Sequence, residues 1–349
     1  MKQNFYDLSY EQIKYTIITE LNEPSFRVDQ IWHGVYKNLW SEFDQFSNLP
    51  KSLRDKIFSR INFSSLKPIK TLVSNDKETL KYLFQLDDGK AIETVLMKYN
   101  HRNTLCISTQ VGCAMGCVFC ATGQMGFKRN LTPGEIVEQV IFFARELAKN
   151  DERVTNIVLM GMGEPFHNYD ATMTSIDRLS DPNGFGLGAR RFTISTVGLV
   201  PMIKRFADEN RQVNLAVSLH AVKDDERSSI MPVNKKYPIK EVIEACKYYV
   251  EKTNRRITFE WALIAGKNDS DQTAVDLSRL LKGLLCHVNA IPLNPTDQTS
   301  LQPSDKSQTI RFQKILEKNG IPCTIRLRRG IDIQAGCGQL AIKQSEGSM

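Results

Sequence analysis

Three cysteines stand in the stretch Cys113-Ala114-Met115-Gly116-Cys117-Val118-Phe119-Cys120, at spacings of four and three residues. Thiolates gathered in a short glycine-containing loop are suited to bind three corners of an iron-sulfur cubane and to leave its fourth iron without a protein ligand. An open iron of this kind can hold a substrate. The stretch therefore predicts a 4Fe-4S cluster bound by Cys113, Cys117 and Cys120.

The same cysteines have two other readings, a zinc site and a disulfide pair. Structural zinc usually takes four protein ligands, commonly from two pairs of the CxxC type, and the chain contains no second pair. A disulfide would leave one of the three clustered cysteines over. We therefore favour the cluster and keep zinc as the alternative.

The composition indicates a globular protein of one large domain, alone or with a small appendage. The chain has 349 residues, eight cysteines and a formal net charge of +7. It contains no apolar run long enough to span a bilayer and no charged-then-apolar leader, so we expect no membrane association. A cluster with an exposed iron would not survive an oxidising compartment, which makes the cytoplasm the expected location. The positive charge permits a polyanionic partner without requiring one.

The first hundred residues change their hydrophobic period once. Apolar residues at helical spacing predict a helical N-terminal accessory domain over residues 1–65, with helices at Tyr10 to Leu21, Phe26 to Leu39 and Leu53 to Ile61. Residues 66–100 are rich in β-branched and aromatic residues. They predict a small β-hairpin segment that joins the core, with strands at Lys67 to Val73, Thr79 to Leu86 and Ala91 to Tyr99 and a turn at Asp87-Asp88-Gly89.

From Thr104 onward, strand and helix patterns alternate, so the fold class is α/β. Strands are expected at Thr104 to Thr109, Ile157 to Met160, Phe192 to Ser195, Val213 to Ser218, Ile257 to Leu263, Val288 to Pro292 and Cys323 to Leu327. Helices are expected between most of them, including Pro133 to Ala148 with Thr132 as its N-cap. This alternation predicts parallel strands in a core domain over residues 101–343, either a barrel or an open sheet. Residues 344–349 are expected to be a tail.

Small polar residues follow several of the predicted strands at corresponding positions. They are Gly163 and Glu164 in Gly161-Met162-Gly163-Glu164-Pro165, then Ser195, Ser218-Leu219-His220 and Asn294. Function gathers at strand ends in such folds, and we interpret the two glycines as letting the backbone approach a ligand. Each residue alone could be an ordinary turn or cap, but the shared position predicts a ring around a polar ligand.

The cysteines outside the loop divide into two groups. Cys246, Cys286 and Cys323 lie among apolar residues and are interpreted as packed core thiols. Cys337 is flanked by glycines in Gly336-Cys337-Gly338, which packs poorly but can deliver a thiol to a site. Cys106 alone would be a buried core thiol. With Cys337 available as a partner, a redox pair is the favoured interpretation.

These motifs, in this order, resemble the RlmN/Cfr family of radical S-adenosylmethionine (SAM) RNA methyltransferases, nearly end to end. The CxxxCxxC pattern with Phe119 before its last cysteine is similar to the radical SAM signature. The other matching stretches are Gly126-Phe127-Lys128-Arg129-Asn130-Leu131-Thr132, Gly161 to Pro165, Ser195-Thr196-Val197-Gly198, Asn214 to His220, Pro292-Leu293-Asn294-Pro295 and Gly330 to Leu340. The resemblance implies a partial (β/α)6 radical SAM barrel with an RNA-binding helical N-terminal domain.

The resemblance also implies a reaction and its residues. Cys337 would take a methyl group from one SAM. A second SAM on the cluster would supply a radical that activates this methyl for addition to an adenine ring carbon. Cys106 would then release the product by forming a transient disulfide with Cys337. Glu93 matches the position of the proton acceptor, although by alternation alone it reads as an exposed strand residue. The positions that match SAM contacts are Gly163, Glu164, Ser195, Ser218, Leu219, His220 and Asn294.

RlmN-like members of the family act on adenine C2 and Cfr-like members on C8. Gly161 to Pro165 and Arg328-Arg329-Gly330 look RlmN-like, which favours C2 methylation of 23S rRNA in the peptidyl transferase centre and of the tRNA adenosine 3′ of the anticodon. The alternatives are a Cfr-type C8 methyltransferase that confers antibiotic resistance and a non-catalytic iron-sulfur RNA-binding protein. The expected partners are these RNAs and a flavodoxin-like electron donor, and the expected state is a monomer.

Basic pairs near predicted loops are suited to RNA phosphates. They are Lys128-Arg129, Arg190-Arg191, Lys235-Lys236, Arg255-Arg256 and the group Arg326, Arg328 and Arg329. Any one of these pairs by itself is ordinary solvated surface. As a set, they are the candidate RNA contacts of the chain.

Overall fold

The computed structural model describes residues 2–342, so the tail expected at 344–349 and the last residue of the predicted core domain lie outside the described residues. The chain begins with a helical unit: α1 (Tyr10–Tyr15), α2 (Phe26–Tyr36) and α3 (Lys51–Arg60). The three predicted helices are therefore confirmed, although α1 continues as a π-helix over Thr16–Glu20 instead of remaining regular to Leu21. Two short parallel strands, β1 (Gln3–Asn4) and β2 (Ile61–Asn62), were not predicted.

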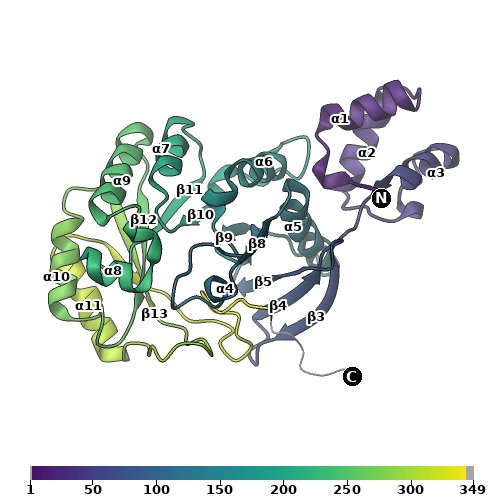
Figure 1. The fold of residues 1–349 in the computed structure, drawn as a ribbon. Coiled ribbons are helices and arrows are strands. Elements are labelled where there is room, and N and C mark those ends of the chain that lie inside the picture. The colour runs from purple at the N-terminus through teal and green to yellow at the C-terminus, as the bar shows by residue number, and fades with distance from the viewer. Residues whose placement is uncertain (1, 343–349) are drawn as a thin grey trace.

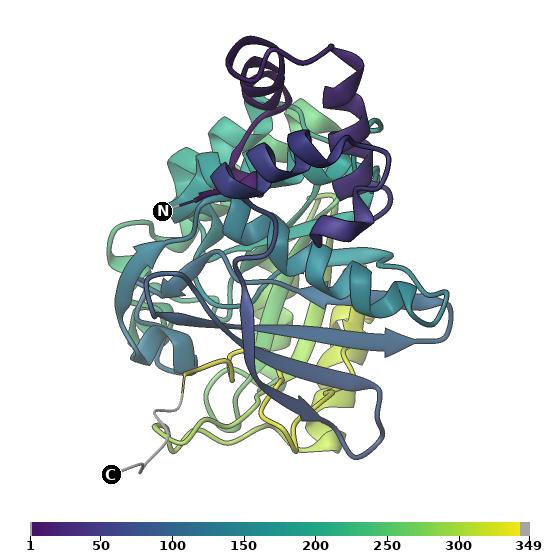
Figure 2. The same ribbon diagram turned by 90° about the vertical axis from the view of Figure 1, so that its right-hand side faces the viewer.

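The helical unit has an aromatic core and is docked on the rest of the chain through several polar contacts, among them a buried carboxylate and the bonds from Arg145 to Tyr6 and Leu39. The Phe5 ring lies 5.1 Å from Phe63 between ring centroids, and Trp32 lies 4.7 Å from Tyr36. Figures 1 and 2 show these purple helices standing at one end of the molecule, beside the strand-helix core. Where the chain enters the core, Glu138 accepts hydrogen bonds from the backbone of Ser65.

A single ten-stranded sheet forms the core, in the order β14-β13-β12-β11-β10-β9-β6-β5-β4-β3. The strands from β6 to β14 are parallel, and β5, β4 and β3 are antiparallel. Their bounds are β3 (Lys67–Val73), β4 (Thr79–Gln85), β5 (Ala91–Tyr99), β6 (Arg102–Cys106), β9 (Asn156–Leu159), β10 (Phe192–Thr196), β11 (Asn214–Ser218), β12 (Ile257–Leu263), β13 (Cys286–Pro292) and β14 (Cys323–Ile325). The α/β class is confirmed as an open, partial barrel.

The segment over residues 66–100, predicted as a β-hairpin segment that joins the core, continues the main sheet. Its strand β5 pairs with β6, with Val95 opposite Cys106 and Met97 opposite Thr104. Because β6 would otherwise present an unpaired edge, these backbone hydrogen bonds merge the antiparallel strands with the parallel ones. The two ends of the sheet, β3 and β14, do not pair with each other.

Crossover helices connect the parallel strands. They are α5 (Pro133–Ala148), α6 (Tyr169–Ser180), α7 (Val200–Asp208), α8 (Asp224–Ile230), α9 (Ile239–Thr253), α10 (Asp271–Leu280) and α11 (Lys306–Lys318). The N-cap predicted for α5 is confirmed: Thr132 Oγ1 accepts from the Glu135 backbone at 3.1 Å, and the Glu135 carboxylate accepts from the Thr132 backbone at 2.9 Å. None of the helices among residues 2–342 is long and apolar enough to cross a membrane.

The chain after β14 crosses the open side of the barrel. The strand predicted to reach Leu327 ends at Ile325, and the following segment runs back toward β4 and β5 without regular structure. Lys81 on β4 donates to the Gln334 carbonyl at 3.0 Å, and the Ala341 backbone donates to Glu93 on β5 at 2.9 Å. Figure 2 shows this yellow segment beside the antiparallel strands. The C-terminal segment thus bridges the gap that the sheet leaves.

Glu138 on α5 binds the backbone where the chain passes from the helical unit into the core. Its Oε1 accepts from the Ser65 and Leu66 backbone at 2.5 and 3.0 Å, and Oε2 accepts from Asn4 at 3.3 Å. Burial raises the pKa of this carboxyl group, while the hydrogen bonds oppose that shift. Glu138→Ala leaves these buried donors without an acceptor, and we expect it to lower the free energy of unfolding by about 2–4 kcal/mol.

Chemical denaturation of the purified protein measures this loss. Glu146→Ala is the matched control, because Glu146 lies on the same helix and pairs with Lys149 at the surface. Equal stability of the two variants would contradict the role of Glu138.

Candidate active site

The three cysteines of the loop are held by a small hairpin beyond β6. Strand β7 (Gln110–Gly112) pairs antiparallel with β8 (Phe127–Asn130), and α4 (Ala121–Gln124) lies between them. Gly112 has a φ of +73°, and a Cβ there would lie 1.9 Å from the Gly126 carbonyl oxygen. Only glycine fits this close approach. The hairpin therefore sets where the chain enters the cysteine loop.

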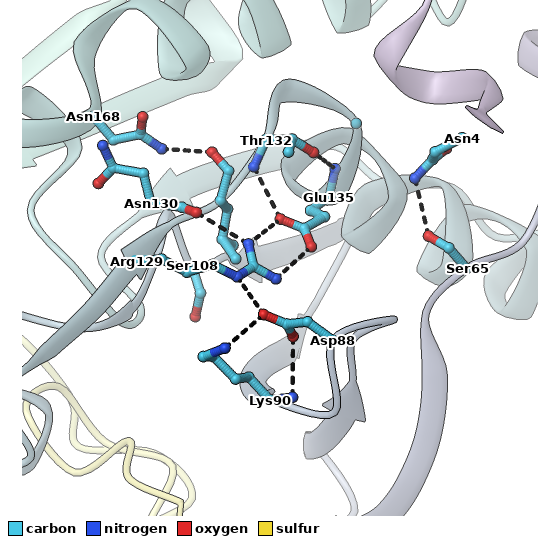
Figure 3. A network of polar contacts seen from close by, with 12 residues as sticks. Asn4, Ser65, Asp88, Lys90, Ser108, Arg129, Asn130, Thr132, Glu135 and Asn168 are labelled. Atoms are coloured by element: carbon cyan, nitrogen blue, oxygen red, sulfur yellow. Dashed lines mark hydrogen bonds and ion pairs between the residues drawn. The ribbon is translucent and has the colours of Figure 1, made fainter. Parts of the chain in front are cut away.

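Arg129 anchors the hairpin to the core (Figure 3). Its guanidinium binds both oxygens of Glu135 on α5 at 2.7 and 2.8 Å, and its Nε binds Asp88 in the β4–β5 turn at 2.7 Å. Arg129 holds the pKa of Asp88 well below its usual range. Two carboxylates therefore occupy the guanidinium that the sequence offered as an RNA-phosphate contact, and Arg129 has a structural role in the hairpin.

Cys113, Cys117 and Cys120 line one cavity. Burial raises the pKa of Cys113 to about 12, and that of Cys117 is raised by burial and further by the neighbouring Cys120 and Cys113. A cationic group in the cavity would let all three ionise together. The cavity is lined by Cys113, Met115, Cys117, Phe119, Cys120, Gly123, Leu159, Met160, Gly161, Gly163, Glu164, Ser195, Thr196, Val197, Ser218, His220, Met231, Glu260, Ala262, Ile291, Leu293, Asn294, Cys337 and Gly338.

These donors fit an iron-sulfur cluster. Three soft thiols from one loop face the same space, with no fourth cysteine from that loop. Among residues 2–342, no group of three His, Cys, Asp or Glu side chains is arranged to hold a metal ion. In a cubane each thiolate binds a different iron, so its three sulfurs need not converge on one point.

The ring of strand-end residues is largely brought together. Gly163, Glu164, Ser195, Ser218, His220 and Asn294 all line the cysteine cavity. Leu219 does not: its side chain is fully buried in the hydrophobic core. It points away because alternate residues of an extended segment face opposite sides.

Glu164 and His220 are both buried at the cavity wall. Glu164 accepts from the Phe166 and Val197 backbone at 3.0 and 2.8 Å, and burial raises its pKa to about 7. His220 accepts at Nδ1 from the Ala262 backbone at 2.9 Å, and burial lowers its pKa to about 3. His220 is therefore neutral at pH 7, with Nε2 carrying the proton. The two side chains offer a carboxylate and a neutral hydrogen-bond donor.

The glycines after β9 line the cysteine cavity and have a second role beside the predicted one. A Cβ at Gly161 would lie 2.6 Å from the Ile107 carbonyl, and a Cβ at Gly163 would lie 2.5 Å from Gln110. Gly163 also has a φ of +105°. The close approach is thus between two segments of the protein, the β9 turn and the start of the cysteine hairpin, as well as toward the cavity.

Asn294 links the cavity to the Cys337 segment. Its Nδ2 donates to the Cys337 carbonyl at 3.1 Å, and a Cβ on Gly336 would lie 2.7 Å from that nitrogen. The buried Oδ1 has no hydrogen-bond partner among the described residues. Since an unmet buried acceptor is costly, this oxygen is placed to accept from a ligand in the cavity.

Cys337 lies between two cavities. It lines the cysteine cavity and also a second one with Cys106, Met160 and Arg326. Both thiols are free; Cys106 is buried, whereas Cys337 is exposed. Burial raises the pKa of Cys106 to about 12, and desolvation raises the pKa of Cys337 above its usual range. Arg326 opposes both shifts, because its positive charge favours the thiolates. The predicted pair thus faces one space, beside a cation.

Glu93 lies on β5, outside both of these cavities. Its buried carboxylate forms an ion pair with Lys81 at 2.9 Å and accepts from the Ala341 backbone at 2.9 Å. It lines a neighbouring cavity with Asp332 and Gln334, across the C-terminal segment from the thiol pair. The structure therefore does not bring Glu93 into the space that Cys106 and Cys337 share. It also contradicts the reading of Glu93 as an exposed strand residue.

Two buried charged residues at the site were missed by the sequence reasoning. Glu260 on β12 lines the cysteine cavity, and a carboxylate inside an otherwise apolar strand was a signal that could have found it. Arg227 on α8 is fully buried and donates to the carbonyls of Val197, Ser218 and Leu219 at 2.7, 3.0 and 2.9 Å. Arg227 therefore links the ends of β10 and β11. In the sequence it follows three acidic residues, a pattern that is typical of a solvated surface.

Comparisons with known proteins agree with this geometry. Residues 107–277 match the radical SAM superfamily model, and residues 3–62 match that of the ribosomal RNA large subunit methyltransferase N-terminal domain. The chain is 47% identical to the probable dual-specificity RNA methyltransferase RlmN of Chloroflexus aurantiacus, covering 97% of this chain and 93% of that protein. It is also 47% identical to the dual-specificity RNA methyltransferase RlmN 1 of Myxococcus xanthus, covering 97% and 94%.

A solved structure shares the fold over nearly the whole chain. It is a radical SAM methyltransferase from Sphaerobacter thermophilus, 50% identical, with a TM-score of 0.94, covering 97% of this chain and 99% of that one. The radical SAM family implies a 4Fe-4S cluster and SAM, which the thiols and the polar cavity accommodate. The chain belongs to the RlmN family of radical SAM methyltransferases.

Proposed function

We propose that this enzyme methylates C2 of adenosine in the peptidyl transferase centre of 23S rRNA and of the adenosine 3′ of the anticodon in tRNA. The observation that carries the proposal is the position of Cys337, which lines both the cavity of the three cysteines and the cavity of Cys106. A methyl group on Cys337 can therefore face a SAM-derived radical on one side and a second thiol on the other. The names of the relatives, dual-specificity RNA methyltransferases, support the two RNA substrates.

The cysteine cavity serves the first half of the reaction. When bound, the cluster and SAM supply a 5′-deoxyadenosyl radical. Cys113, Cys117 and Cys120 hold the cluster. Glu164, His220 and Asn294, with Gly163, Ser195 and Ser218, line the space in which SAM is oriented. We retain Leu219 only as a backbone contact, because its side chain is in the core.

The Cys106 cavity serves the second half of the reaction, in which the activated methyl group is joined to adenine and the product is released. The full sequence of steps is as follows. Cys337 first takes a methyl group from one SAM by thiolate attack, and hydrogen abstraction leaves a methylene radical on its sulfur. This radical adds to adenine C2. The adduct loses the ring proton and one electron, which the oxidised cluster would take back, and the Cys106 thiolate then attacks the Cys337 sulfur. The carbon–sulfur bond breaks, the released methylene carbon takes up a proton, methylated adenosine leaves, and a disulfide remains for an external dithiol to reduce. Two SAM molecules are consumed per turnover.

Glu93 is proposed as the acceptor of the ring proton. Its burial raises its pKa and the charge of Lys81 opposes that shift. Because Ala341 lies between Glu93 and the thiol cavity, direct contact with the adenine requires the C-terminal segment to shift, or one water to relay the proton. Glu93 thus lies next to the cavity of Cys106 and Cys337, and not inside it.

Nucleoside analysis tests the proposed product. Reconstituted enzyme is incubated anaerobically with SAM, reductant and either 23S rRNA or tRNA, and the digested nucleosides are identified by mass spectrometry against synthetic standards. We expect 2-methyladenosine in both RNAs. Formation of 8-methyladenosine instead would show Cfr-type regiochemistry, and methylation of one RNA alone would remove the dual specificity.

Loss of the resolving thiol should trap the covalent adduct. In Cys106→Ala the step that breaks the carbon–sulfur bond lacks its nucleophile, so we expect a protein–RNA crosslink that survives denaturing electrophoresis. Cys286→Ala is the control, because Cys286 is a buried thiol on β13 that lines neither cavity. A Cys106→Ala enzyme that turns over without crosslinking would exclude this role.

Removal of a cluster ligand should abolish iron binding while the protein stays folded. We expect Cys117→Ala to lose most of its iron and sulfide after anaerobic reconstitution, because the remaining thiols leave a corner of the cubane unbound. Chemical assays of iron and sulfide and the visible charge-transfer absorbance measure this, with Cys286→Ala as the control. Wild-type iron content in Cys117→Ala would rule out Cys117 as a ligand.

A further inference from the structure

A basic cavity of about 660 Å³ lies at the N-terminal ends of the parallel strands. Its polar residues Thr193, Asn214, Thr258 and His287 all stand at the beginning of their strands. The cysteine loop and the strand-end ring lie at the opposite ends of the same strands. We call this cavity the arginine basin, and define it by Arg102, Arg190, Arg255, Arg256 and Arg326.

The charges in the arginine basin are not balanced by carboxylates. Among the described residues that line it, Glu260 is the single acidic side chain, and it lies 3.9 Å from Arg326. Arg190 and Arg255 both donate to the neutral amide oxygen of Gln212, at 3.1 Å each. No ion pair joins Arg102, Arg190, Arg255 or Arg256 to any carboxylate in the described part of the chain.

Several arginines elsewhere on the surface are paired with carboxylates. Arg205 pairs with Asp170 at 2.7 Å, Arg211 with Asp177 at 2.6 Å and Arg279 with Asp276 at 2.9 Å. Unpaired guanidinium groups that converge on one hollow repel each other, so their grouping has a cost that a bound polyanion offsets. The planar guanidinium fork matches phosphate oxygens better than any other side chain does.

The arginine basin borders the methyl-transfer site. It shares Val158, Met160 and Arg326 with the cavity of Cys106 and Cys337, and it shares Met160 and Glu260 with the cysteine cavity. The Arg102 guanidinium also stacks on the Tyr99 ring at 4.3 Å, and Tyr99 lines the thiol cavity. A phosphate held in the basin would therefore be the neighbour of a base that reaches the two thiols.

We propose that the arginine basin binds backbone phosphates next to the target adenosine and so sets the position of the RNA strand. This inference rests on the proposed function, which supplies RNA as the substrate. Three of the basic groups that the sequence scattered along the chain contribute to it: Arg190, Arg255 with Arg256, and Arg326. Base chemistry requires the adenine to leave its stack, and phosphate contacts on its flanks hold the strand while it does so.

The test measures RNA binding without SAM or reductant, so that it is independent of methylation. The variant is Arg102→Gln with Arg256→Gln. Both side chains are exposed, and neither forms an ion pair with a carboxylate in the described part of the chain. Arg102→Lys with Arg256→Lys keeps the charge, and Arg279→Gln with Arg311→Gln removes two charges from α10 and α11 on the outside of the barrel (Figure 1). The probes are a synthetic tRNA anticodon stem-loop and inorganic phosphate.

We expect the glutamine pair to bind the stem-loop more weakly. The slope of log affinity against log salt concentration should become less steep by about 0.7 for each phosphate that the variant no longer binds. The lysine pair should restore most of the slope, and the α10–α11 pair should match wild type. In turnover the glutamine pair should raise KM with kcat unchanged, and RNA-free reductive cleavage of SAM should continue.

Two results would overturn the proposal. One is an unchanged salt slope and affinity in the glutamine pair. The other is a glutamine pair that no longer binds inorganic phosphate but binds RNA with wild-type affinity. This result would make the basin a site for small anions. Methylation by the wild-type enzyme is measured separately. Either result can therefore occur while 2-methyladenosine still forms, which overturns the role of the basin alone. Failure of methylation, in turn, does not change the binding result.

Discussion

A backbone hydrogen bond of 2.7 Å from Ala121 to the Gly338 carbonyl joins the cysteine loop to the segment that carries Cys337. The second tie is Asn294, which donates to the Cys337 carbonyl. Together they hold one thiol at the boundary of two cavities. The sheet does not close, so without this segment the barrel interior would be open on the side between β14 and β3. A partial barrel thus becomes an enclosed site through contacts made after its last strand.

Buried charge is distributed unevenly along the barrel. At the cysteine end, Arg227 is buried among carbonyl oxygens, and burial lowers its pKa to about 10. His220 is neutral, and Glu164 and Glu260 are the acidic side chains that line that cavity. At the other end several arginines face a solvent-filled hollow. Low dielectric at one end strengthens each electrostatic contact with SAM, whereas water at the other end permits exchange of a large polyanion.

Local pattern predicted most elements of the core. The period of apolar residues located the helices α5, α6, α7, α9, α10 and α11 and the strands from β9 to β13 within a few residues, because these segments bury one face or are wholly buried. The short helix α8 was not predicted. The failures lie where tertiary contacts decide. The strand predicted from Cys323 to Leu327 ends at Ile325, where the chain leaves the sheet, and the predicted hairpin segment 66–100 pairs with β6 through register contacts that no local pattern specifies.

For the site, the sequence by itself determined the three-cysteine spacing, the strand-end ring except the Leu219 side chain, and the two thiols outside the loop. Each of these depends on residue type and short-range position. Tertiary structure alone decided that Cys337 lies between the two cavities, that Glu93 is paired with Lys81 behind Ala341, and that Arg129 is neutralised while other arginines converge. Those facts depend on segments far apart in the sequence meeting in space, and no local propensity encodes such distances.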